Sequence, residues 1–155
     1  MRKRTNANVP AKGRLRDMAD SLWSLAVRAD WANRCVVCGS NKVEAHHLTP
    51  RQFEATRYDL SNGVSLCARC HKHDPKVSPH LNAAGWCAWL NHHHPVRMAW
   101  YLDNRRPAWN GTKNAAYYIE VIRRLKQYVE PEDFTRIVGV KFEAWLEETA
   151  VDEAE

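Results

Sequence analysis

Two C-x-x-C pairs constrain the fold of this chain more than any other feature of its sequence. Each pair lets a tight turn present two thiolates, and together they supply four cysteines: Cys35, Cys38, Cys67 and Cys70. Four thiolates complete the closed tetrahedral shell of a structural Zn²⁺ site. Disulfides are the alternative, but no apolar secretory segment precedes the cysteines, and stable disulfides belong to oxidising compartments. The spacing therefore predicts a structural zinc site.

The segment between the two pairs carries the candidate chemistry. Residues 43–47 have the pattern of a short strand, GVSL before the second pair is its antiparallel partner, and a helix carrying His71 follows. Neighbouring residues on a strand point to opposite faces, so His46 and His47 must have different roles. One of them can share a metal with His71, while the other faces a substrate. A polar surface pair is the plainer alternative.

The stretch CVVCGSNKVEAHHLTPRQFEATRYDLSNGVSLCARCH resembles the HNH endonuclease family, whose motif runs C-x-x-C, HH or DH, Asn, then C-x-x-CH. The resemblance covers Cys35 to about His73. It implies an α+β fold, in which a small ββα-metal motif with a four-cysteine zinc knuckle is flanked by N- and C-terminal helices. It also implies DNA hydrolysis with Mg²⁺ or Mn²⁺, in addition to the structural Zn²⁺.

The same resemblance implies a role for each residue of the motif. The first histidine of the pair, here His46, is a ligand of the catalytic metal. The second, here His47, is the general base that takes a proton from the attacking water. The asparagine, here Asn62, braces the loop and orients the base, and the last histidine, here His71, is the other metal ligand.

One departure from the family concerns the catalytic metal. Some members carry a further histidine four residues after the final one, where this chain has Pro75. We therefore keep His73 as a further candidate ligand. The missing histidine favours Mg²⁺ or Mn²⁺ over a catalytic Zn²⁺.

Charge points to a polyanionic partner. The formal net charge is +5 and the pI is about 9.1, which favours DNA without proving it. Basic residues gather in the first sixteen positions, where we expect a flexible arm for phosphates, with a solvated tail as the alternative. Acidic residues gather from position 143 onward, where we expect a frayed, solvated helix end, with competition against DNA for the basic face as the alternative. The candidate DNA contacts are Arg14, Arg16, Arg51, Arg57, Arg105 and Arg106. Among these, Arg57 is our candidate for the scissile-strand phosphate.

At 155 residues the chain fits one domain. We expect a flexible basic arm at 1–13, a nuclease domain at 14–148 and an acidic tail at 149–155. Within the domain, the ββα-metal core spans about 33–76 and a helical extension about 79–148. Apolar periodicity and turn residues predict helices at about 14–32 and from about 79, 95, 113 and 131. The His92–His94 run falls at a helix end, where a surface position is more typical than a metal site.

Together these features favour a metal-dependent DNA endonuclease that hydrolyses phosphodiester bonds, by nicking or double-strand cleavage. Two alternatives stay open: a branched-DNA endonuclease, from a looser resemblance to the NinG (Rap) phage recombination enzymes, and a non-catalytic zinc-stabilised DNA-binding protein. Small stand-alone HNH proteins are typical of phages, so we expect a cytoplasmic location in a bacterial host and no membrane association. Candidate partners besides DNA are a second copy of the chain and phage packaging or recombination proteins.

Overall fold

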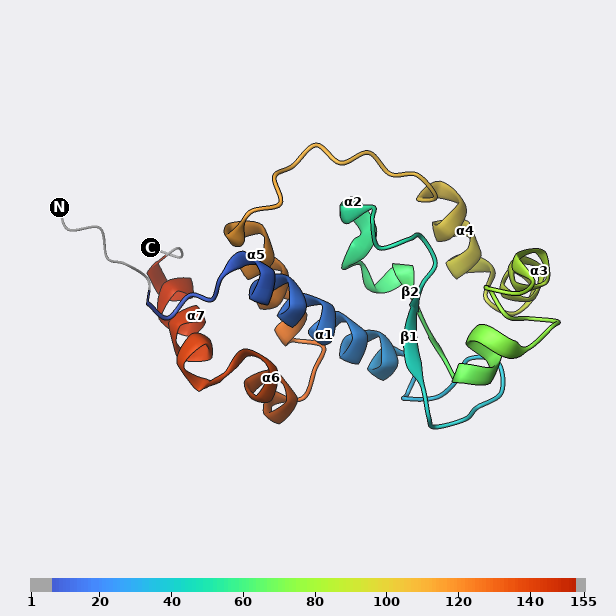
Figure 1. Ribbon diagram of the computed structural model, residues 1–155, viewed down its shortest axis with the longest axis horizontal. Helices are drawn as coiled ribbons and strands as arrows, with labels where there is room; N and C mark the ends of the chain where they lie inside the picture. Colours follow the sequence, from blue (N-terminus) through green and yellow to red (C-terminus); the bar gives the residue numbers. More distant parts are fainter. Residues whose placement is uncertain (1–6, 153–155) are drawn as a thin grey trace. The chain divides into compact units, whose positions relative to one another are not determined.

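The computed structural model describes residues 7–152 and divides the chain into two compact units (Figure 1). One unit spans Trp23–Gly111, and the other joins the residues up to Leu22 with those from Thr112 onward. Helix α1 (Lys12–Asp30) contributes residues to both. The expected basic arm and acidic tail lie partly outside the described residues.

The unit at 23–111 contains a β-hairpin followed by helices (Figure 1). Strands β1 and β2 are antiparallel, with His46 opposite Val64 and His47 opposite Gly63. The four cysteines flank the hairpin, so the predicted α+β class is confirmed. After α1, the elements of this unit are β1 (Glu44–His47), α2 (Glu54–Arg57), the 3₁₀ turn η1 (Leu60–Asn62), β2 (Gly63–Leu66), the π-helical turn η2 (Arg69–His73), α3 (Ala83–His93) and α4 (Pro95–Asp103).

A small apolar core holds this unit together. Strand β2 is buried at all four positions, and α3 contributes Trp86 and Leu90 to the same cluster. The complete buried cluster is Cys35, Leu48, Val64, Leu66, Cys67, Cys70, Trp86 and Leu90. Three of its members are cysteines of the C-x-x-C pairs, so the C-x-x-C turns and the apolar core are one structure.

The helix that the sequence pattern predicts from about position 79 begins later than expected. Residues 74–81 form turns instead, because the side chains of Asp74 and Ser78 accept hydrogen bonds from backbone N–H groups just after them. Helix α3 then begins after Asn82, whose side chain accepts the N–H of Gly85 at 2.8 Å. Such a cap satisfies an otherwise unpaired donor at the helix start.

The other unit is helical, with α5 (Ala115–Lys126), α6 (Pro131–Val138) and α7 (Val140–Asp152). The sequence pattern predicts one last helix, but the structure divides it at Gly139, where φ is +81°. Lys126 joins α5 to α7 through Glu143 at 3.2 Å and Glu147 at 2.8 Å. No helix in the described part of the chain is long and apolar enough to cross a bilayer.

Candidate metal centres and active site

The four cysteines of the C-x-x-C pairs converge, as the sequence spacing predicts. One Sγ atom from each lies within 4.8 Å of the others, and the Sγ atoms of Cys38 and Cys67 are 3.6 Å apart. Tetrahedral Zn²⁺ with bonds of about 2.3 Å places its sulfur ligands about 3.8 Å apart. All five cysteines of the chain are free thiols. The spacing of the four sulfur atoms fits a shared Zn²⁺ ion and excludes S–S bonds.

The surroundings of the cysteines also suit a metal. Burial raises the pKa of Cys35, but backbone N–H groups of Cys67, Cys38 and Val37 outweigh it and lower that pKa to about 7. Burial raises the pKa of the Cys70 thiol. Gly39 after the first pair has φ +77°, a left-handed backbone conformation that glycine adopts at little cost, so the chain turns sharply there. A cation that displaces the thiol protons would offset the repulsion between the four closely spaced thiolates.

A second group of ligand atoms is formed by three histidines. His46 from β1, His71 from η2 and His80 from the following turn place one ring nitrogen each within 4.8 Å of the other two. The His46 Nδ1 and His71 Nε2 atoms are 2.8 Å apart, and the His80 Nε2 and His71 Nε2 atoms are 3.0 Å apart. The structure therefore brings the predicted pair together and adds a third imidazole.

Glu44 fixes which nitrogen of His71 faces the cluster. Its Oε1 lies 2.6 Å from His71 Nδ1, and Lys72 contacts the same carboxylate. The pKa of Glu44 is lowered, first by the hydrogen bond from His71, so the carboxylate accepts and Nδ1–H donates. The lone pair of His71 is then on Nε2, toward His46 and His80. Carboxylates commonly orient metal-binding histidines in this way.

The two predicted ligands of this cluster favour their neutral forms. Burial, followed by the nearby His71 and His80, lowers the pKa of His46 to about 3. Burial also lowers the pKa of His71, although Glu44 opposes this effect. Neutral imidazoles keep the lone pairs that a metal needs. Three imidazole nitrogens, with one ring oriented by a carboxylate, are a donor set that fits a divalent cation.

His80 was not among the candidates from the sequence. Ser78, fully buried, donates its hydroxyl to the carbonyl of His71 at 2.7 Å and accepts the N–H of His80. These bonds turn the chain back, so that His80 joins the cluster. His73 is exposed and lies outside the cluster. No spacing in the sequence predicts that His80 joins the cluster. The sequence could have predicted Glu44, because residues two apart on a strand share a face, and this places Glu44 on the same face as His46.

His47 faces the other side of β1, as strand alternation predicts. Its Nε2 lies 2.9 Å from the carbonyl oxygen of Arg57. Because a carbonyl can only accept, Nε2 carries a proton, and the lone pair of the neutral ring is on Nδ1. The ring stacks on the indole of Trp23, with centroids 3.7 Å apart and planes 10° from parallel. The neutral His47 imidazole therefore has a fixed tautomer that can accept a proton at Nδ1.

Asn62 braces the loop between the strands. It is fully buried, and its Oδ1 accepts the N–H of Thr49 at 2.6 Å. Its Nδ2 donates to the carbonyls of Thr49 and Thr56, each at 3.0 Å. These three bonds hold both ends of the loop that supplies the Arg57 carbonyl, and thus the hydrogen bond to His47.

The candidate DNA-binding arginines have different surroundings. The Arg57 guanidinium is mostly buried and contacts Glu54 at 3.1 Å and the Arg51 carbonyl at 3.4 Å, so its phosphate contact stays a prediction. The exposed ones are Arg14, Arg16, Arg51, Arg105 and Arg106.

The His92–His94 run lies at the end of α3, where His93 stacks on Trp89. It is not among the groups of the described residues that could hold a metal ion.

The sequence model of the HNH endonucleases matches residues 35–75. That range holds the four cysteines, the His46–His47 pair, Asn62 and His71, but neither His80 nor helix α1. Nothing matches in the comparison with curated proteins or in that with solved structures.

Proposed function

We propose that this chain, whose residues 35–75 belong to the HNH endonuclease family, is a metal-dependent endonuclease that hydrolyses phosphodiester bonds of DNA. One observation carries the proposal: His47 and His46, which belongs to the three-histidine cluster, extend from opposite faces of the same four-residue strand. A proton acceptor is thus held at a fixed place relative to a group that can bind a cation. Hydrolysis of a phosphodiester needs both.

In this proposal His46, His71 and His80 hold the divalent cation. When bound, the cation would stabilise the charge that develops on the phosphate and on the leaving 3′ oxygen. We expect Mg²⁺ or Mn²⁺ to serve. The missing histidine at position 75 is the reason for preferring these two metals to Zn²⁺, and His80 supplies a third imidazole in its place. Between Mg²⁺ and Mn²⁺, imidazole nitrogens favour Mn²⁺.

The remaining residues of the motif activate the attacking water, position the general base or stabilise the fold. His47 accepts the proton of the attacking water at Nδ1, a task for which a neutral imidazole is suited. Asn62 positions it indirectly, through the segment between the strands that supplies the Arg57 carbonyl. The cysteines supply a structural Zn²⁺ site and take no part in the chemistry. With one such site per chain, a monomer would nick a single strand.

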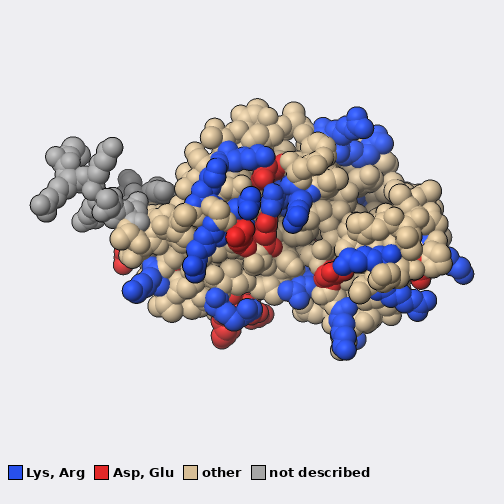
Figure 2. Space-filling model, viewed as in Figure 1, with Lys and Arg blue, Asp and Glu red and all other residues tan. Residues whose placement is uncertain are grey.

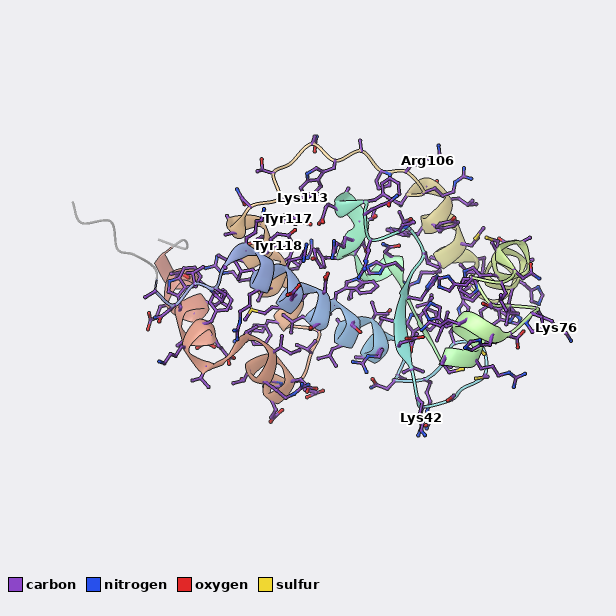
Figure 3. The ribbon with its side chains drawn as sticks, viewed as in Figure 1. Lys42, Lys76, Arg106, Lys113, Tyr117 and Tyr118 are labelled. Atoms are coloured by element: carbon purple, nitrogen blue, oxygen red, sulfur yellow. The ribbon has the colours of Figure 1, made fainter. Side chains whose placement is uncertain are left out.

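The exposed arginines after α4 are our candidates for holding the DNA backbone. Lys and Arg occupy several groups on the face shown in Figure 2, some bordered by acids, so each candidate needs its own argument. Thr49 lies two residues after the end of the histidine strand, and its hydroxyl donates to the Asn104 carbonyl at 3.0 Å. This bond ties Arg105 and Arg106, the next two residues, to the active-site strand. Figure 3 shows Arg106 at the end of α4.

Replacing Arg105 and Arg106 with glutamine should weaken DNA binding in a salt-dependent manner. Each phosphate contact contributes a slope of about −0.9 to log K against log salt. The double variant should therefore lose up to about two units of slope, measured by fluorescence anisotropy with a labelled duplex. Arg136→Gln is the matched control, because Arg136 is exposed but paired with Asp133. An unchanged slope in the double variant would show that these arginines do not contact phosphate.

Replacing His80 with alanine should weaken binding of the catalytic cation but not of zinc. Loss of one imidazole from three should raise the Mn²⁺ dissociation constant by at least about 10- to 100-fold, and nicking should then require more Mn²⁺. Isothermal titration of zinc-loaded protein measures the affinity directly. His73→Ala is the comparison, because His73 is exposed and outside the cluster. If His73→Ala loses Mn²⁺ affinity and His80→Ala retains it, the two assignments must be exchanged.

The proposed function is tested by nicking of supercoiled plasmid by zinc-loaded protein with Mg²⁺, Mn²⁺ or excess EDTA. We expect conversion to open circles with the metals and none with EDTA. If the plasmid stays intact, a four-way DNA junction is the second substrate. Cleavage of the junction alone would favour the NinG-like alternative. Binding of both DNAs without cleavage of either would overturn the enzymatic proposal in favour of a zinc-stabilised DNA-binding protein.

A further inference from the structure

A residue outside the family motif contacts the candidate general base. Trp23 lies on α1, twelve positions before Cys35, and its indole is stacked on the His47 imidazole at 3.7 Å between centroids. The side chain is only 3% exposed. Its Nε1–H donates to the Asp59 carbonyl at 3.0 Å. Both the position and the rotation of the indole are therefore fixed.

Both rings are hydrogen-bonded to the same short backbone segment, between Arg57 and Asp59. His47 donates from Nε2 to the carbonyl of Arg57, and Trp23 donates to the carbonyl two residues later. Asp59 is itself held, since its N–H donates to Thr56 and its carboxylate accepts the N–H of Ser61. The segment between the strands thus sets the relative placement of base and indole.

Helix α1 also lies unusually close to the hairpin at this point. Gly63 is the partner of His47 across the strands, and a Cβ atom at Gly63 would lie 2.2 Å from a methyl of Val27 and 3.1 Å from the Trp23 ring. Val27 is one helical turn after Trp23, so both project from one face. Only glycine permits this approach.

A single hydrogen bond does not fix an imidazole. The second side-chain torsion of histidine is broad, so the hydrogen bond at Nε2 by itself would let the ring rock about the line joining Nε2 to the Arg57 oxygen. Such rocking would move Nδ1, the proton-accepting atom. A flat indole stacked on the ring removes this freedom, because rocking would break the parallel contact.

We propose that Trp23 is a positioning residue, which holds the plane of His47 so that Nδ1 faces the attacking water. The inference rests on the proposed function of His47 as base. Because Trp23 is only 3% exposed and stacks on His47, we expect it to act through His47 rather than on the substrate. The family motif at 35–75 would then depend on a helix outside it for the orientation of its base.

The test compares Trp23→Leu and Trp23→Phe with Trp31→Leu in the plasmid-nicking reaction. Trp31 is the matched control, because its Nε1–H donates to the Gly63 carbonyl at 3.1 Å while its ring meets His94 rather than His47. We expect Trp23→Leu to lower kcat about 10- to 100-fold with KM and metal content unchanged. Trp23→Phe, which keeps a flat ring, should recover most of the loss.

A kinetic cycle separates positioning from a general loss of structure. On a His47→Ala background, Trp23→Leu should cause no further fall in the residual rate, because the ring that it positions is gone. Equal falls with and without His47 would overturn the inference. So would a wild-type kcat in folded Trp23→Leu, or a loss of the same size in Trp31→Leu.

A spectroscopic measurement needs neither activity nor a stable variant. In the wild-type protein, the ring current of Trp23 should shift the His47 ring protons upfield in the NMR spectrum, and ¹⁵N shifts should show the proton on Nε2. Unshifted ring protons would overturn the inference even if every Trp23 variant unfolds. Shifted protons in a protein that nicks no DNA would instead count against the proposed function.

Discussion

Replacing His47 with alanine should abolish cleavage while leaving the fold and both metal clusters in place. A positioned general base contributes about 10²- to 10⁴-fold to a rate, and the neighbouring histidine of the strand cannot replace it, because His46 faces His71 and His80 instead. The loss of stacking on Trp23 should lower the free energy of unfolding by only about 1 kcal/mol.

The measurement is single-turnover nicking with saturating Mn²⁺, together with zinc content and thermal unfolding of the same preparation. His92→Ala is the matched control, since His92 is an exposed histidine at the end of α3 and should keep the wild-type rate. Added imidazole should restore part of the activity of His47→Ala by entering the space beside Trp23. A His47→Ala protein that nicks at the wild-type rate would remove His47 from the mechanism.

Local sequence was sufficient to predict the core of the site. Two residues between cysteines define a knuckle turn, and alternation along a strand separates His46 from His47; neither depends on distant parts of the chain. The structure accordingly brings the four cysteines together and places the two histidines on opposite faces of β1.

The unpredicted parts depend on contacts that local patterns do not encode. His80 joins the cluster through the bond from Ser78 to the His71 carbonyl, which exists only once the turn has folded. Trp23 fits the apolar stripe of a helix equally well whether it packs on aliphatic side chains or on the candidate base. A pattern of apolar positions thus locates a buried face, but it does not say what that face covers.

Cys35→Ser should lose zinc and unfold the unit at 23–111. Structural Zn²⁺ contributes about 10–16 kcal/mol in small zinc domains, while a whole domain is stable by about 5–15 kcal/mol. Three of the four cysteines lie in the buried core cluster with Val64 and Leu66, so a bound ion would support the hairpin directly. His71 follows the second pair, and loss of zinc should therefore also disperse the histidine cluster.

Tryptophan fluorescence reports this unfolding well, because six of the seven tryptophans lie in that unit and only Trp145 lies elsewhere. A red shift should accompany zinc loss in Cys35→Ser, or in the wild type with a strong chelator, and a reducing agent alone should cause none. Cys87→Ser is the matched control, since the fifth cysteine is half-buried and outside the cluster. A folded, active Cys35→Ser protein without zinc would show that the apolar core is sufficient to stabilise the unit. Unfolding of Cys87→Ser to the same extent would show that the burial of cysteines, rather than the metal, stabilises it.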